Sequence, residues 1–202
     1  MESGSSRKKP TPRRNTRAKR DGGSAGPDVQ FDTKGRSIQV CDTRIINSEQ
    51  RAFCRRLLEA AAYLHDTGHY VSDTRHHKHS YYLVANSDLP GFTLNEREII
   101  ANLCRYHRKA LPTPEHENLQ LLDAEDQRAV AWLIPLLRLA DSLDRSHGQR
   151  IRSVECKQRD SDFLVTLNVP PETDIDLEIW AAERLTEIFR QVYNKPVAIT
   201  RV

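Results

Sequence analysis

Cysteine is scarce in this sequence and long apolar runs are missing, and both shortages limit what the protein can be. The four cysteines lie far apart in the 202-residue chain and form no C-x-x-C pair. No stretch approaches the roughly 18 consecutive apolar residues of a membrane span, and no apolar signal segment opens the chain. We therefore expect a cytoplasmic protein with reduced thiols, without a disulfide framework, a cysteine-rich zinc site or a membrane helix.

Acidic residues are nearly absent from the first 20 positions, which hold eight lysines and arginines against Glu2 alone. The whole chain carries a formal charge of only +3, so the remainder is mildly acidic. Residues 1–28 are predicted to be a disordered basic tail, because so few apolar side chains cannot offset the entropy of ordering. Residues 7–20 could bind nucleic acid or another anion non-specifically, or could be a solvated extension; they contain no aromatic side chains for base stacking.

A helical repeat of apolar residues begins at position 48, after a lead-in of uncertain structure at 29–47. The predicted helical segments are 48 to about 66, 94–107 and about 125–145. Thr93 and Glu96 form a capping box before the second segment. Gly68 is expected to end the first segment as a left-handed C-cap, and Pro135 to kink or split the third.

Strand-like alternation replaces the helical repeat after Gly148. The expected elements are strands at 151–157 and 162–169, a helix to Tyr193 that starts near Leu177, and a strand at 197–202. The sequence thus predicts a mainly α protein: a helical bundle over residues 48–149, followed by a small β-β-α-β unit over residues 150–202.

Four polar residues lie on, or directly beside, helix faces that are otherwise apolar. His65 and Asp66 close the first helical segment, His107 closes the second, and Asp141 lies in the apolar stripe of the third. Buried imidazoles and carboxylates need partners, and one divalent ion can satisfy several of them at once. The pattern predicts a metal site at which Asp66 would bridge two ions.

The cluster at 76–79 would supply a further imidazole, from His77 or His79. Each residue also has a simpler interpretation. A lone histidine on an apolar helix face is usually a satisfied core residue, Asp141 could pair with a nearby arginine, and the cluster could be a solvated loop. The joint occurrence of these residues in this order favours the metal site.

Five motifs carry a resemblance to a known family. They are AAAYLHDTGH (60–69), HHKHSYYL (76–83), LPGFT (89–93), YHRK (106–109) and LRLADSLDRS (137–146). Through them, residues 57–145 resemble the HD domain superfamily of metal-dependent phosphohydrolases. More narrowly, the chain is similar to the C-terminal helical region of the exopolyphosphatase/guanosine pentaphosphate phosphohydrolase (Ppx/GppA) family.

The resemblance implies an HD-domain-like bundle that holds a divalent metal, Mg²⁺ or Mn²⁺. The metal ligands would be His65, Asp66, His79, His107 and Asp141, with Asp66 and His107 in catalytic roles. Two departures stand out. HD phosphohydrolases take another histidine from an upstream helix, whereas no histidine precedes the His-Asp pair here. The 47 residues before the first helix are also too few for the N-terminal catalytic domains of full-length exopolyphosphatases.

Basic side chains near these residues suit a phosphate-rich ligand. Arg108 and Lys109 follow His107, and Arg138 and Arg145 flank Asp141. The last two could equally be salt-bridge partners of the carboxylate.

The leading hypothesis is an HD-type phosphohydrolase acting on polyphosphate or a phosphorylated nucleotide. The alternative is a non-catalytic module that binds the same ligand. A third hypothesis is an adaptor that works through its basic tail. Assembly into a homo-oligomer is compatible with all three.

Overall fold

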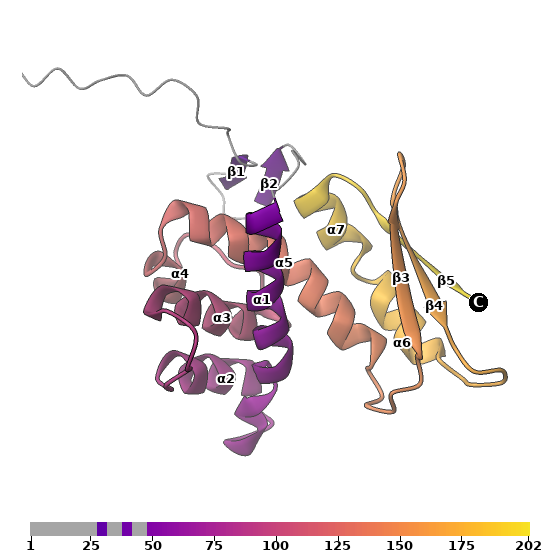
Figure 1. Cartoon of the computed structure of the whole chain (residues 1–202), viewed down its shortest axis with the longest axis horizontal. Helices are drawn as coiled ribbons and strands as arrows, with labels where there is room; N and C mark the ends of the chain where they lie inside the picture. The colour runs from indigo at the N-terminus through magenta and orange to yellow at the C-terminus, as the bar shows by residue number, and fades with distance from the viewer. Residues whose placement is uncertain (1–27, 32–37, 42–47) are drawn as a thin grey trace, which may run out of the picture.

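The computed structural model describes residues 28–31, 38–41 and 48–202, and it consists of a helical bundle joined to a small α+β unit (Figure 1). The bundle elements are α1 (Ser48–Leu64), the 3-10 helix η1 (Thr67–Tyr70), α2 (His76–Ala85), α3 (Leu94–Tyr106), α4 (Glu117–Gln120) and α5 (Ala124–Leu143). The α+β unit contains β3 (Ser153–Gln158), β4 (Phe163–Asn168), α6 (Asp176–Glu183), α7 (Thr186–Tyr193) and β5 (Val197–Arg201). The predicted fold class is confirmed.

Helix α3 lies at the centre of the bundle and buries residues on most of its surface, including Ile99, Ile100 and Leu103. It begins with the predicted capping box, in which the Thr93 hydroxyl accepts a hydrogen bond from the Glu96 backbone N–H and the Glu96 carboxylate accepts one from the Thr93 backbone N–H. The helix is therefore fixed at its start by local bonds and along its length by packing. Its far end carries His107.

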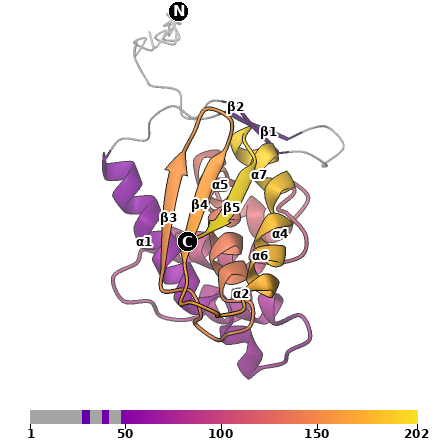
Figure 2. The same ribbon diagram turned by 90° about the vertical axis from the view of Figure 1, so that its right-hand side faces the viewer.

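The C-terminal sheet has the strand order β3-β4-β5, with β3 antiparallel to β4 and β4 parallel to β5. Helices α6 and α7 cover one face of it and lie between the sheet and α5, whereas the other face is open (Figures 1 and 2). Val165 and Leu167 of β4 are buried on the covered face together with Phe189 and Val192 of α7. The unit is thereby anchored to the bundle through one continuous core.

A split at Pro135, one of the two outcomes expected there, and a single helix up to Tyr193 were both wrong. Pro135 does not split α5, which is one helix from Ala124 to Leu143. The buried neighbours Ile134 and Leu137 hold both halves in the core, which offsets the missing backbone hydrogen bond. The helix expected up to Tyr193 is instead two helices, because a tight turn at Leu185, whose N–H donates to the Ala182 carbonyl, separates α6 from α7.

Gly68 is not the left-handed C-cap that the sequence suggested. Among the described glycines only Gly91 has a positive φ, of 89°. Gly68 instead lies inside η1 at a close approach to α2, where an added Cβ would fall 2.0 Å from the His76 carbonyl oxygen and 2.5 Å from the Ser80 nitrogen. The position thus needs glycine for space and not for backbone conformation.

The lead-in contains two short antiparallel strands, β1 (Asp28–Phe31) and β2 (Ile38–Cys41). The basic tail expected at 1–28 lies almost entirely outside the described residues. None of the described helices is long and apolar enough to cross a bilayer.

Candidate metal centre

A tight corner between α1 and α2 places the His-Asp pair. The His65 N–H donates to the Ala61 carbonyl as the last turn of α1, and the chain then enters η1. Ser80, which is fully buried in α2, holds the corner: its hydroxyl donates to the His65 carbonyl at 2.5 Å and accepts from the Gly68 N–H at 2.9 Å. Adjacent side chains that would diverge on a continuous helix are thereby directed toward one interior point.

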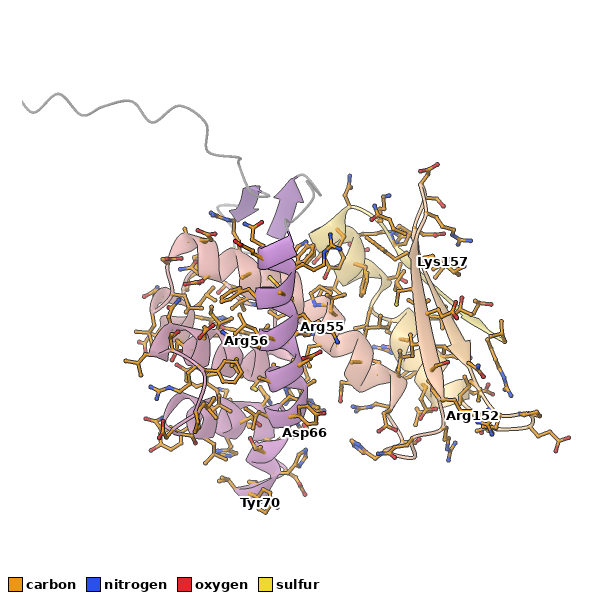
Figure 3. The ribbon with its side chains drawn as sticks, viewed as in Figure 1. Arg55, Arg56, Asp66, Tyr70, Arg152 and Lys157 are labelled. Carbon is orange, nitrogen blue, oxygen red and sulfur yellow. The ribbon has the colours of Figure 1, made fainter. Side chains whose placement is uncertain are left out.

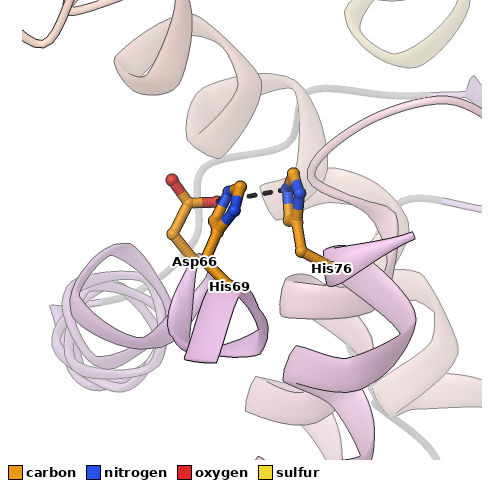
Figure 4. Close-up of side chains that lie close together, drawn as sticks. All are labelled: Asp66, His69 and His76. Carbon is orange, nitrogen blue, oxygen red and sulfur yellow. Dashed lines mark ion pairs between the residues drawn. The ribbon is translucent and has the colours of Figure 1, made fainter. Parts of the chain in front are cut away.

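Asp66 lies between two groups of ligand atoms. On one side, His65 Nε2 is 3.5 Å from Asp66 Oδ2 and 3.7 Å from Asp141 Oδ1. On the other side, Asp66 Oδ1 faces the Nε2 atoms of His76 at 3.3 Å and His69 at 3.7 Å (Figure 4). In each group, Asp66–His69–His76 and His65–Asp66–Asp141, the ligand atoms lie within 4.8 Å of one another. The two oxygens of one carboxylate therefore face different groups, which is the arrangement of a bridging ligand.

His107 adds a further imidazole beside Asp66 and His76. Its Nε2 lies 3.5 Å from Asp66 Oδ1 and 3.2 Å from His76 Nε2, and its side chain is almost fully buried. Two buried ring nitrogens that face each other at this distance are unfavourable unless a proton or a cation lies between them. The pair therefore suits a shared metal ion.

The opposite ring nitrogens fix the tautomers of these imidazoles. The Nδ1 atoms of His65 and His107 lie 2.8 and 2.7 Å from the backbone carbonyls of Ala62 and Cys104. A carbonyl only accepts hydrogen bonds, so Nδ1 donates and the lone pair lies on Nε2, which points into the site. The Nδ1 atom of His76 similarly faces a carbonyl, at 3.3 Å.

Burial keeps two of these histidines neutral, as metal ligands must be. Burial and the nearby His65 lower the pKa of His107 to about 4. Burial and the neighbouring His69 lower the pKa of His76. For His65, burial opposes protonation, but the contacts with Asp141 and Asp66 outweigh it and raise the pKa. A cation would take the place of that proton.

These groups open into a pocket of about 200 Å³. Its walls are Asp66, His69, His76, His107, Arg108, Asp141, Arg145, His147 and Leu177. Leu177 belongs to α6, so the C-terminal unit closes one side of the pocket. No aromatic residue other than histidine is among the lining residues, and the two arginines beside a carboxylate- and imidazole-rich floor suit a phosphate group.

The structure brings together four of the five residues expected to hold metal: His65, Asp66, His107 and Asp141. His79 belongs to neither ligand group, and His76 lies at the site instead. The interpretation of 76–79 as a solvated loop was wrong, because these residues start α2 and His76 and His77 are buried. His77 is nevertheless absent from the pocket walls.

Sequence reasoning assigned no role to His69, His76 or His147. The signal for His69 was its position three residues after Asp66. A turn of 3-10 helix places two residues at that spacing on the same side of the helix. For His76, the signal was its position in the expected cluster.

The four basic residues divide into two pairs. Arg108 and Arg145 line the pocket, and an Arg145 Nη1 atom lies 3.7 Å from Asp141 Oδ2. Arg138 is turned away: its guanidinium donates to the carbonyls of Tyr106, Lys109 and Ala110 at 2.9–3.0 Å. Arg138 thus satisfies carbonyls at the end of α3 and just after it, and Lys109 takes part through its backbone.

Replacing Arg138 with glutamine should therefore destabilise the fold without weakening phosphate binding. We expect Arg138→Gln to lower the free energy of unfolding by about 2 kcal/mol, because carbonyl groups at the end of α3 lose their charged donor. The matched change Arg108→Gln should leave stability nearly unchanged and weaken pyrophosphate binding about tenfold. Urea unfolding and calorimetric titration with pyrophosphate measure the two effects, and the reverse pattern would show that these roles are exchanged.

Comparisons with known proteins support the assignment to a family. The chain is 27% identical over 119 residues to the guanosine-5'-triphosphate,3'-diphosphate pyrophosphatase of Pseudoalteromonas translucida, which covers 59% of this chain and 21% of that protein. It is 30% identical over 140 residues to the protein of the same name from Vibrio atlanticus, covering 67% of this chain and 26% of that one.

The same name belongs to a protein of Photobacterium profundum, to which the chain is 36% identical over 97 residues. That match covers 46% of this chain and 18% of the relative. The chain thus matches only about a quarter or less of the length of these relatives. Residues 36–185 match the family described as Ppx/GppA phosphatase, domain III, and the chain therefore belongs to the Ppx/GppA phosphatase family.

Proposed function

We propose that this chain is a metal-dependent phosphohydrolase that cleaves phosphoanhydride bonds in polyphosphate or in a phosphorylated nucleotide. The observation that carries the proposal is the position of Asp66, whose two carboxylate oxygens face separate groups of ligand atoms. Family membership supports a phosphatase, and the pyrophosphatase names of the relatives support a phosphoanhydride substrate.

The donor set fits a divalent transition metal. Asp66, His69 and His76 make one ligand group, with His107 Nε2 close to the ligand atoms of Asp66 and His76, whereas two carboxylates and one imidazole make the other. Imidazole suits Fe²⁺ or Zn²⁺ best, whereas Mg²⁺ and Mn²⁺ both favour oxygen ligands; of these two expected ions, the transition metal Mn²⁺ accepts imidazole more readily. A divalent ion bound there would polarise a phosphoryl oxygen and lower the pKa of a nearby water molecule.

The residues of the chain would position the substrate. Arg108 and Arg145 both line the pocket beside its histidines and would hold phosphate oxygens there. Because the pocket is small and its walls offer no Tyr, Phe or Trp for stacking, it would accept the phosphate end of a ligand and leave any nucleobase outside.

The proposal is tested by metal removal and reconstitution. The chain depleted of metal with EDTA should release no phosphate from polyphosphate or guanosine pentaphosphate. Addition of Mn²⁺ should restore release, and mass spectrometry of the reconstituted protein should find up to two metal ions per chain. Failure to retain any metal would contradict the proposal.

The second candidate is a module that binds the same ligands without hydrolysing them. The absence of a histidine before His65 favours it, because the His65–Asp66–Asp141 group then offers only three ligands. In the same experiment, retention of metal and binding of polyphosphate without phosphate release would identify this function.

A further inference from the structure

Strand β3 is an exposed edge of the C-terminal sheet. All six of its residues are exposed, whereas most of the β4 residues next to it are half-buried or buried. Figure 2 shows β3 at the outer edge of the sheet, with β4 on one side of it; α1, seen beyond its other side, lies farther back in the bundle (Figure 1), and no described strand pairs with that edge. No proline lies in β3, so every residue keeps its backbone donor. The strand is therefore free to pair with another strand.

The register identifies which backbone groups are free. The Arg159 N–H donates to the Asp162 carbonyl, just beyond the pair Gln158–Phe163. In an antiparallel ladder, hydrogen-bonded pairs alternate with non-hydrogen-bonded pairs. Every second residue back from Arg159 is therefore also hydrogen-bonded to β4, so Glu155 and Lys157 direct their backbone groups toward that strand. Val154, Cys156 and Gln158 consequently present their N–H and C=O groups at the free edge. The bond from the Phe163 N–H to the Pro196 carbonyl, on the opposite side of β4, agrees with this alternation.

The side chains of β3 are self-complementary in one register. If two β3 strands pair antiparallel about Cys156, Val154 lies opposite Gln158 and these residues supply the hydrogen bonds. Glu155 of each strand then lies opposite Lys157 of the other, at a non-hydrogen-bonded position where side chains are closest. A register centred on Gln158 would instead bring Lys157 against Arg159, and a parallel pair in register would align like charges.

We propose that the free edge of β3 pairs antiparallel with β3 of a second copy of this chain. Two three-stranded sheets then join into one continuous sheet, with two Glu155–Lys157 ion pairs on its open face. The apolar side chain of Val154, 44% exposed here, would lose water contact on the other face. The inference is independent of the proposed function, because Lys157 lies on the sheet well away from Asp66 (Figure 3).

Charge exchange at β3 tests this pairing. Sedimentation of the full chain over a range of concentrations should show a monomer–dimer equilibrium. Glu155→Lys and Lys157→Glu should each weaken dimerisation about tenfold or more, because each puts like charges opposite one another twice per dimer. The double variant Glu155→Lys/Lys157→Glu restores both pairs and should return the dimer to near wild-type strength. The circular dichroism of all variants should match the wild type, because both positions are exposed.

Three results would overturn the proposal. These are a wild-type chain that stays monomeric up to millimolar concentration, a dimer that persists unchanged in both single variants, and a double variant that remains as weak as the single ones. A short bismaleimide provides a second measurement. It should cross-link wild-type dimers through Cys156 and leave Cys156→Ser uncross-linked, because paired strands bring the two thiols close together.

Discussion

Replacing Asp66 with asparagine should remove the two proposed metal ions and with them at least about 99% of the proposed phosphate-releasing activity. Asparagine has nearly the shape of aspartate but carries no negative charge and only one oxygen. The single side-chain oxygen of asparagine can face only one of the two ligand groups, and the loss of negative charge weakens metal binding at both. We expect the metal content of the reconstituted variant to fall from up to two ions to well below one per chain. Elemental analysis and a phosphate-release assay measure the two effects.

Asp88→Asn is the matched control, because Asp88 is an exposed aspartate in the loop between α2 and α3. It should keep its metal and its activity within about twofold of the wild type. If Asp66→Asn kept full activity while losing its metal, a contaminating phosphatase would be the source of the released phosphate. If it kept both metal and activity, the ligand role of Asp66 would be wrong.

The central residues of this site were predictable because helical periodicity identifies them. His65 and Asp141 interrupt apolar stripes that otherwise face the core, and a buried imidazole or carboxylate is favourable only with a partner. The capping box at Thr93 and the strands of the C-terminal unit could likewise be predicted, because the sequence patterns that indicate them are local.

The rest of the site depends on contacts between distant segments. His76 reaches Asp66 because Ser80 fastens the corner between α1 and η1 to α2. No periodic pattern encodes such a corner. The orientation of the Arg138 side chain could not be predicted for the same reason. Its partners are carbonyls about 30 residues earlier in the chain, and not the carboxylate of Asp141 three residues away.

The same distinction explains the errors in the fold. Gly68 looked like a C-cap because a glycine just after a helix usually is one, whereas its environment is set by α2, whose first residue is eight positions later. Pro135 looked like a helix break because the local cost is visible in the sequence and the compensating core packing is not.

Gly68→Ala should therefore be among the most destabilising single substitutions in the bundle. The new Cβ would overlap two backbone atoms, the His76 oxygen at 2.0 Å and the Ser80 nitrogen at 2.5 Å, and backbone cannot yield as the end of a side chain can. The start of α2 must move away from η1, and we expect the free energy of unfolding to fall by about 3 kcal/mol. Thermal and urea unfolding of the metal-free chain measure this loss.

Gly148→Ala is the control, because the nearest atoms to its added Cβ are the side chains of Arg150 and Ser146, at 3.1–3.3 Å. It should cost less than about 1 kcal/mol. Gly68→Ala should also weaken Mn²⁺ binding, since the same movement takes His76 away from Asp66. A variant as stable as the wild type that binds Mn²⁺ normally would mean that the corner yields easily. The imidazoles would then have to be held in place by the metal, because the fold alone would not hold them.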